Sequence, residues 1–421
     1  MTFHKRPALT ARDLAIVTGL AVIGLVVIGA LVAANILWSR LLDGGGSFLS
    51  IWVGAREFVL NAGDPYGADV VSRTQLLVYG GSGPQGQNPY RLDVPFFLLP
   101  FAFPLALISD ASVARGVWIS ASQVALLGAL VLVIGLLEIR ARPSLVAILV
   151  LLCLSSLYAV GAYVEGAPAV LLTLGYIGIL WAMQKGMDEL AGTIGVLCLF
   201  KWEVGLPFLF LVAWRVSREQ RWRVLAGFGM TLVVLLMLAF LLNPGWFMPF
   251  FTASVGMLRS PHGVSTMSAL VRLSPDHGLE IARAVTVILI AMLVFEWAVG
   301  RDADFRRFVW NACLVLAATP LVGFRTGLEN LVALLPCVVL VALVSLQRHR
   351  AALPLGLTFT LLAFALPWFL SWPGTGLTER AAQDVLFLLL PLLCLTGMYW
   401  TRWWFLRPAQ TWLDQVRAVD R

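Results

Sequence analysis

Two ionisable residues stand inside an otherwise apolar stretch between Ala191 and Val216. Lys201 and Glu203 are only two positions apart, so they do not face each other on one helix and each needs another partner. Charged groups inside apolar segments are costly, and their presence there suggests a functional site. A lysine in this setting can receive a phosphate group, and the alternative is a structural ion pair.

Two carboxylates lie in the long polar segment 39–114. Asp43 is followed by glycines 44–46, which give its backbone freedom, and Asp93 directly precedes a short apolar segment. Either carboxylate can serve as a general base, provided that it comes within about 3 Å of the proton it takes. The alternatives are a solvated turn for Asp43 and, for Asp93, a helix cap or an ion pair with Arg91.

Other polar residues allow two interpretations each. Arg325 can bind a phosphate or pair with Glu329 four positions later. Asp64 and Tyr66 belong to a Gly-Asp-Pro-Tyr sequence that is typical of a turn, after a helix expected to end near Asn61. The chain has no Walker-type loop, no Cys-x-x-Cys pair and no His-Glu-x-x-His sequence. We therefore expect no ATP hydrolysis, no thiol redox chemistry, no metal and no cofactor.

The composition determines the setting in which these residues work. The 421 residues are 60% hydrophobic and 13% charged, whereas soluble domains are about 45–50% apolar and about 25% charged. This excludes a water-soluble protein. The net charge of +7 is expected to reflect membrane orientation and not nucleic-acid binding. All five cysteines lie in apolar runs, so we expect buried thiols and no disulfide framework.

The hydrophobic pattern predicts many membrane-spanning helices. A crossing needs roughly 20 apolar residues for about 30 Å of hydrocarbon, and such runs lie near 14–38, 115–137, 143–163, 166–184, 224–243, 279–299, 307–323, 329–347, 354–372 and 384–400. The stretch 94–108 would reach only about 22 Å and contains three prolines, so it is predicted to be re-entrant or interfacial. We expect 191–216 to form two short helices that meet at a polar tip.

Most of the 30 lysines and arginines fall in alternate loops. The positive-inside rule then predicts twelve crossings with both termini cytoplasmic, in a multi-pass protein of the cytoplasmic (inner) cell membrane. The prediction is a single membrane domain, 1–421, in contact with membrane lipids. Its parts are a first helix at 14–38, an extracytoplasmic loop at 39–114 with the re-entrant segment, the remaining helices at 115–400 and a cytoplasmic tail at 401–421.

Short sequence elements along the chain occur in a characteristic order. They are Gly-Gly-Gly-Ser-Phe at 44–48, Gly-Asp-Pro-Tyr at 63–66, Asp-Val-Pro at 93–95, Ala-Arg-Gly-Val-Trp at 114–118, Ala-Gly-Thr-Ile-Gly at 191–195 before Lys201, and Thr-Pro at 319–320 before Arg325. This order, over roughly residues 44–345, resembles glycosyltransferase family 87. That family is the polyprenol-phosphate-mannose-dependent mannosyltransferase-like group with the GT-C fold.

The resemblance implies an all-α polytopic membrane protein. Its fold would be a GT-C-like bundle of about 12 transmembrane helices, with amphipathic and re-entrant helices in the extracytoplasmic first loop. The implied activity is transfer of a hexose, mannose by resemblance, from a polyprenyl-phosphate donor to a lipid or glycan acceptor at the extracytoplasmic face. A lipid-phosphate sugar is a substrate in this reaction, and nucleic acid has no part in it.

The resemblance also assigns residues, with some departures. The family carries an Asp, usually taken as the base, where this chain has Ser47; it has Tyr-Pro where this chain has Val-Pro at 94–95; and its middle polar motif is reduced to Glu-Gly-Ala-Pro at 165–168. Asp43 or Asp93 is therefore the expected catalytic base. The expected substrate-binding residues are Ser47, Asp64, Tyr66, Arg91, Glu165, Lys201 and Arg325. Because of Ser47, the alternative is a catalytically inactive relative that binds or transports a lipid-linked sugar.

Overall fold

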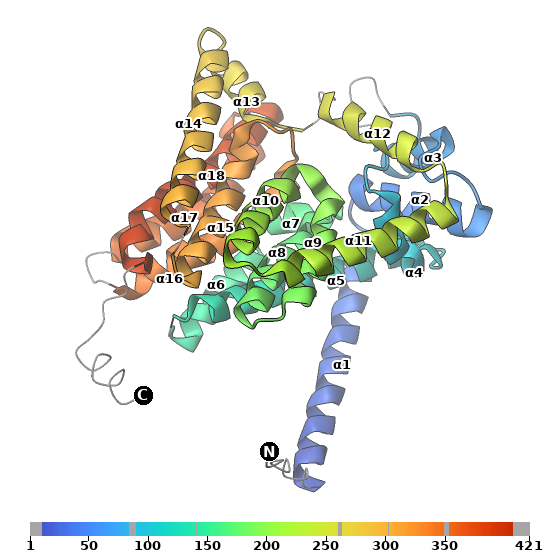
Figure 1. Cartoon of the computed structure of the whole chain (residues 1–421). Helices are drawn as coiled ribbons and strands as arrows, with labels where there is room; N and C mark the ends of the chain where they lie inside the picture. Colours follow the sequence, from blue (N-terminus) through green and yellow to red (C-terminus); the bar gives the residue numbers. More distant parts are fainter. Residues whose placement is uncertain are drawn as a thin grey trace.

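The computed structural model describes residues 11–83, 90–139, 141–259, 263–301, 303–348 and 353–406 (Figure 1). Within these ranges the backbone is helical with connecting turns, and one isolated antiparallel bridge joins Val264 to Thr326. The α-helices are α1 Ala11–Ser39, α2 Gly46–Asn61, α3 Ala68–Tyr79, α4 Phe103–Ala106, α5 Ala111–Leu137, α6 Pro143–Leu154, α7 Leu157–Glu165, α8 Ala169–Gln184, α9 Asp188–Leu197, α10 Trp202–Glu219, α11 Trp222–Leu242, α12 Phe247–Arg259, α13 Thr266–Leu273, α14 Gly278–Val299, α15 Phe305–Ala318, α16 Leu335–Arg348, α17 Leu353–Leu370 and α18 Glu379–Leu406. Short 3-10 helices are η1 Phe96–Ala102, η2 Cys198–Lys201, η3 Thr319–Val322, η4 Leu328–Leu334 and η5 Pro373–Thr375.

The expected polytopic all-α architecture is confirmed, but the count of twelve crossings is not. In the described ranges, nine helical stretches are long and apolar enough to cross a membrane, or ten if the bent pair α6–α7 is one span. Two of the expected twelve are absent from that count for different reasons. Helix α8 has only 16 residues, and the two helices α9 and α10 are counted together as one stretch, Asp188–Glu219. Most of the expected tail, residues 407–421, lies outside the described residues.

The stretch from α9 through η2 to α10 folds back on itself. A straight helix of 32 residues would separate its ends by almost 50 Å. Instead, the guanidinium of Arg221, just beyond α10, forms an ion pair with Asp188 at the start of α9 and donates to the Met183 carbonyl at 2.8 Å. The predicted pair of short helices is therefore confirmed, and η2 with Lys201 forms its tip.

A second break separates α6 from α7, which the sequence led us to expect as one run. The two helices meet at an angle of 45°. Ser156 accepts a hydrogen bond from the Ala159 N–H at 3.2 Å and caps α7, while its own hydroxyl donates to the Cys153 carbonyl at 2.9 Å. A serine that caps a new helix favours such a break over continuation. Helix α7 consequently has its own axis and ends at Glu165.

The first loop packs as a compact helical layer beside α5. Arg56 on α2 donates to the carbonyls of Ala106 and Ile108 at 2.7 and 2.9 Å, which closes the carboxyl end of α4. The segment 96–106 forms η1 and α4, and most of its apolar side chains are buried against neighbouring helices. The segment is therefore a short helical one and not a full span, as predicted. Its re-entrant or interfacial position in a membrane stays a prediction.

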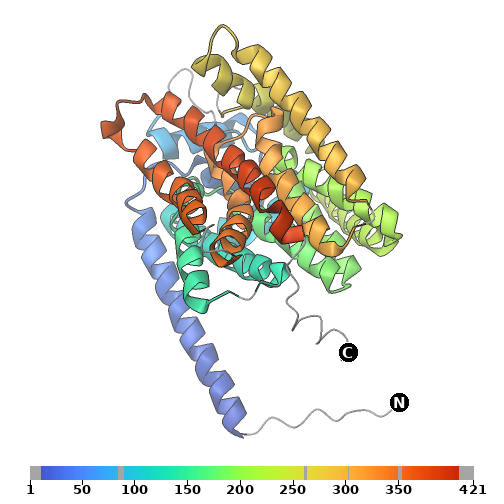
Figure 2. The same cartoon turned by 90° about the vertical axis from the view of Figure 1, so that its left-hand side faces the viewer.

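Helix α1 extends away from the other helices in both views (Figure 1 and Figure 2). Its carboxyl-terminal part is fixed to α5: Asn35 donates to Ser120 and Gln123 at 2.9 and 2.7 Å, and Gly116 lies directly under Ile36. The apolar side chains at 21–30 are exposed, as expected for a helix that faces lipid. The first loop thus begins at the end of α1 that is anchored to the bundle.

A buried carboxylate joins the carboxyl-terminal helices. Glu296 on α14 is only 1% exposed and accepts hydrogen bonds from Arg307 on α15 at 3.1 Å and from Arg402 on α18 at 3.0 Å. The Tyr399 hydroxyl donates to its other oxygen at 3.3 Å. None of these residues was expected to belong to a site, and their mutual pairing gives them a structural role.

All five cysteines are buried and free, as expected.

Candidate functional site

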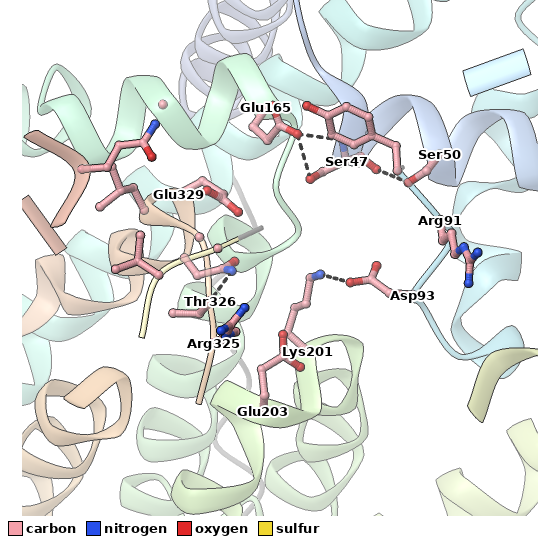
Figure 3. A pocket seen from close by; sticks show the side chains of 18 of the residues that line it. Ser47, Ser50, Arg91, Asp93, Glu165, Lys201, Glu203, Arg325, Thr326 and Glu329 are labelled. Carbon is pink, nitrogen blue, oxygen red and sulfur yellow. Dashed lines mark hydrogen bonds and ion pairs between the residues drawn. The ribbon is translucent and has the colours of Figure 1, made fainter. Parts of the chain in front are cut away.

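A cavity of about 580 Å³ opens between the start of α2, the end of α7, the tip of the α9–α10 hairpin and the loop before η4 (Figure 3). Its lining is mostly polar or charged. It is formed by Ser47, Ser50, Tyr90, Arg91, Asp93, Gly161, Glu165, Lys201, Trp202, Glu203, Ser254, Gly263, Val264, Arg272, Arg325, Thr326, Gly327, Leu328, Glu329, Asn330, Arg380 and Gln383. A polar cavity at membrane-spanning helices is the arrangement expected for a substrate site.

Ser47 and Glu165 meet at one wall of this cavity. The backbone N–H of Ser47 donates to Oε1 of Glu165 at 3.1 Å, and the Ser47 hydroxyl donates to the same oxygen at 3.2 Å. Ser47 lies in the first turn of α2, where backbone N–H groups lack helical partners and favour negative charge. These two residues are 118 positions apart in the chain.

Helix α5 holds both sides of this contact. Arg115 is buried and donates to the carbonyls of Leu42 and Asp43 at 3.1 and 3.3 Å, and to that of Val164 at 2.5 Å. One guanidinium therefore joins the loop before α2 to the last turn of α7. Trp118, one turn along α5, donates to the Gly166 carbonyl at 3.0 Å. The positions of Ser47 and Glu165 are fixed by the surrounding fold as well as by their own hydrogen bonds.

A different wall carries an ion pair between Lys201 and Asp93. The side chains are only 12% and 18% exposed, respectively. Lys201 comes from the tip of the α9–α10 hairpin, and Asp93 comes from the first loop just before η1. An ion pair was one of the interpretations that the sequence allowed for each of these residues. The expected partner of Asp93 was Arg91, whereas in the structure it is Lys201. The amine still lines the cavity.

Glu203 lies below that pair, and Arg325 and Glu329 lie on the side of Lys201 away from Asp93 (Figure 3). Arg325 lies in the turn before η4, so it is not on one helix with Glu329, which belongs to η4. The backbone bridge between Val264 and Thr326, with N–O distances of 2.9 Å in both directions, connects this turn to the segment before α13. Arg325 therefore faces the cavity from a loop whose next residue, Thr326, is held by this backbone bridge.

Tyr90 completes the wall near Ser47. Its ring lies against Gly46, where any side chain would collide with it. Burial raises the pKa of the Tyr90 hydroxyl, and the nearby Glu165 carboxylate raises it further. The phenol therefore stays protonated and acts as a hydrogen-bond donor at neutral pH.

The structure brings together six of the nine residues that we selected from the sequence. Ser47, Arg91, Asp93, Glu165, Lys201 and Arg325 line the cavity, and Asp43, Asp64 and Tyr66 do not. The side chain of Asp43 is exposed, and only its backbone carbonyl is held, by Arg115. Asp64 accepts from the Tyr66 N–H at 3.0 Å in the expected turn, and the Tyr66 hydroxyl donates to the Val94 carbonyl at 2.7 Å. These two residues shape the loop, and Asp43 lies outside the cavity.

Three residues that line the cavity were not among those selected from the sequence, namely Tyr90, Arg272 and Arg380. Arg272 pairs with the buried Asp384 at 2.5 and 2.6 Å, which joins α13 to α18, and these hydrogen bonds raise the pKa of the Arg272 guanidinium. No local pattern marks these residues. Asp384 in the predicted span at 384–400 was a usable signal, because a charge inside a membrane span needs a partner.

Within the described ranges, no three His, Cys, Asp or Glu side chains gather in a way that could hold a metal ion.

Comparison with protein families gives a match for this architecture. A model of glycosyltransferase family 87 matches residues 94–322, just over half of the 421 residues. The chain belongs to glycosyltransferase family 87. The expected resemblance is thereby confirmed, and this family 87 protein is a multi-pass membrane glycosyltransferase. Comparisons with curated proteins and with solved structures find no match.

The matched residues cover only part of the cavity of this family 87 glycosyltransferase. Glu165 and Lys201 lie inside the match, whereas Ser47 and Asp93 precede its first residue, 94. The Arg325 loop follows its last residue, 322. The cavity therefore combines the matched segment with parts of the chain on both sides of it.

Proposed function

We propose that this family 87 glycosyltransferase transfers a hexose, mannose by resemblance, from a polyprenyl-phosphate donor to a lipid or glycan acceptor. The observation that carries the proposal is the cavity, in which the cations Lys201 and Arg325 lie apart from the carboxylate of Glu165 (Figure 3). The leaving group of such a donor is a phosphate, which needs cationic donors, and the acceptor hydroxyl needs a carboxylate to take its proton. A single displacement at the anomeric carbon requires no metal and no covalent intermediate.

Lys201 and Arg325 are the proposed phosphate ligands, with Arg91 at the rim. All three side chains line the cavity, and Lys201 lies at the tip of a hairpin within the apolar bundle. A cation in such a position has lost water and gains more from a phosphate than an exposed one does. Asp93 stays next to Lys201 in this scheme and orients the amine.

The reaction is proposed to take place at the extracytoplasmic face of the cytoplasmic (inner) membrane, with both termini inside. The cavity lies beyond the carboxyl end of α1 and is lined by the first loop and by segments packed against that loop. The distribution of lysine and arginine favours a cytoplasmic start of α1. A lipid donor can then present its phosphate at the membrane surface.

The experiment is a transfer assay with purified protein, radiolabelled polyprenyl-phosphate-mannose or polyprenyl-phosphate-glucose, and a membrane lipid extract as acceptor. Transfer from one donor, reduced at least tenfold in Lys201→Gln and Arg325→Gln, would support the proposal. Retention of the donor without transfer would favour the second candidate, an inactive relative that binds or transports the lipid. That candidate is favoured by Ser47 standing at the position of the family's acid.

A further inference from the structure

The proposed transfer requires a group that takes the proton of the acceptor hydroxyl. We propose that Glu165 is this general base and that Ser47 is a positioning residue for it. The inference rests on the proposed function, and it assigns the base to a residue that neither carboxylate expectation from the sequence included.

The carboxylate of Glu165 combines access to the cavity with an anchored geometry. Both hydrogen bonds from Ser47 go to Oε1, at 3.1 and 3.2 Å, so Ser47 leaves Oε2 to other partners. Figure 3 shows Glu165 beside Ser47 at one end of the cavity, apart from Lys201 and Arg325. A proton acceptor on one wall and phosphate ligands on another leave the space between them for the reacting sugar carbon.

Asp93 is the competing carboxylate in the same cavity, and its surroundings suit it less. Its carboxylate forms an ion pair with Lys201, whereas the described residues show no ion pair with Glu165. The amine of Lys201 therefore already occupies the carboxylate of Asp93, which leaves it less available to an acceptor hydroxyl. In addition, a base next to the phosphate ligand would lie on the side of the leaving group, opposite to an attacking hydroxyl.

The surrounding fold keeps Glu165 in place. It is the last residue of α7, and Gly166 ends the helix with a φ of 68°, a backbone conformation that glycine adopts without strain. The backbone on either side is held by Arg115 at Val164 and by Trp118 at Gly166. General bases work when their geometry is fixed in this way before the substrate binds.

The step balances as a single displacement. The acceptor oxygen attacks the anomeric carbon and forms the new glycosidic bond, while the bond from that carbon to the phosphate oxygen breaks. The bonding electron pair leaves with the polyprenyl phosphate, whose charge Lys201 and Arg325 receive. The proton of the acceptor hydroxyl moves to Glu165, and solvent removes it once the product has left.

A purely structural role would give Glu165 only the task of capping α2. The substitution Glu165→Gln separates the two roles, because the glutamine carbonyl still accepts both hydrogen bonds from Ser47 but is no longer a base. We expect at least a 100-fold loss of kcat, within the range of about 10²–10⁴ for general bases, with unchanged retention of radiolabelled polyprenyl-phosphate-mannose on the purified protein. The matched control is Glu280→Gln, an exposed glutamate on α14, which should transfer sugar like the wild type.

A second variant tests the location of the carboxylate directly. Because the Ser47 hydroxyl lies 3.2 Å from Oε1 of Glu165, an aspartate at position 47 would bring a carboxylate to the same corner of the cavity. The double variant Ser47→Asp with Glu165→Gln is expected to recover at least tenfold of the lost kcat. Ser47→Ala alone should lower kcat about tenfold and leave donor retention unchanged, since it removes one of the two anchoring hydrogen bonds.

The outcomes distinguish this inference from the proposed function. Transfer by the wild type together with transfer by Glu165→Gln within threefold of it would overturn Glu165 as the base and leave the glycosyltransferase function standing. A Glu165→Gln protein that no longer retains donor, with no recovery in the double variant, would show a structural role and also overturn the inference. Absence of transfer by the wild type with every donor would overturn the proposed function and the role of Glu165 with it.

Discussion

A substitution of Asp93 is the sharpest test of the separate roles that we propose for the charged residues of the cavity. The substitution Asp93→Asn removes the negative charge next to Lys201 but retains a side-chain oxygen that can accept a hydrogen bond from the amine. The two side chains are only 12% and 18% exposed, so water replaces the lost partner incompletely. We expect a moderate loss of stability together with a small effect on turnover.

The size of the stability effect follows from the burial of the pair. Two unit charges about 4 Å apart attract by about 4 kcal/mol at an effective dielectric constant near 20. The asparagine recovers about 1 kcal/mol as a hydrogen bond, and the residual exposure screens part of the remainder. A net loss of about 1–3 kcal/mol results. For 421 residues, at about 2.1 cal/mol/K per residue, the melting temperature should fall by about 1–3 °C.

Turnover should respond differently. Lys201 keeps its charge in Asp93→Asn and no longer pairs with a charged Asp93, so the KM for the donor should stay constant or fall, and kcat should fall less than about tenfold. Lys201→Gln is the opposite variant, because it leaves the Asp93 charge facing the incoming phosphate. There the donor KM should rise at least tenfold.

The assay is sugar transfer by the purified proteins at several donor concentrations, with thermal unfolding measured on the same samples. A 100-fold loss of kcat in Asp93→Asn, without loss of donor binding or of the folded state, would refute this reasoning. It would make Asp93 the base and reduce Lys201 to its partner.

Three further predictions concern other parts of the fold. Glu296→Gln should destabilise the protein by about 3 kcal/mol, because two arginines lose their shared buried counter-charge; melting temperatures should show a fall of about 3–4 °C, whereas Glu280→Gln on the same helix should have no effect. Gly166→Ala should reduce sugar transfer at least tenfold, because its φ of 68° disfavours alanine and the new methyl group would collide with α2; Gly229→Ala, at a position with open space, should retain full activity. Arg325→Gln should raise the donor KM at least tenfold with a smaller change in kcat, measured in the same kinetic series, and an effect on kcat alone would contradict phosphate binding.

The sequence was sufficient for those features that depend on local pattern. Apolar run lengths predicted the helical membrane architecture, the prolines of 94–108 predicted a short segment in place of a span, and the charges at 201 and 203 predicted a hairpin tip. The break between α6 and α7 was not predicted, because a serine capping a new helix inside an apolar run gives a weak signal.

Contacts between distant segments could not be obtained in this way. Asp43 was selected because it lies close to Ser47 in the chain, yet its side chain is exposed outside the cavity. Glu165, 118 positions away, makes the contact with Ser47 instead. A sequence shows which residue types are present near a motif, but only the packing of α5, through Arg115, determines that the end of α7 meets the start of α2.

A serine at the position where the resemblance places an acid therefore does not by itself imply an inactive protein. What a displacement reaction requires is a carboxylate in the right corner of the cavity, and the helix that supplies it is immaterial to the chemistry. Here the break at Ser156 gives α7 its own direction, Gly166 ends that helix directly after Glu165, and the first turn of α2 receives the carboxylate through Ser47. A serine at position 47 is the residue that this arrangement favours, because an aspartate there would face Glu165 with a second negative charge at hydrogen-bond distance. The same argument predicts that Ser47→Asp alone, with Glu165 retained, is less active than the wild type, and that replacing Glu165 by glutamine in that background raises activity; the opposite order of activities would contradict a shared site.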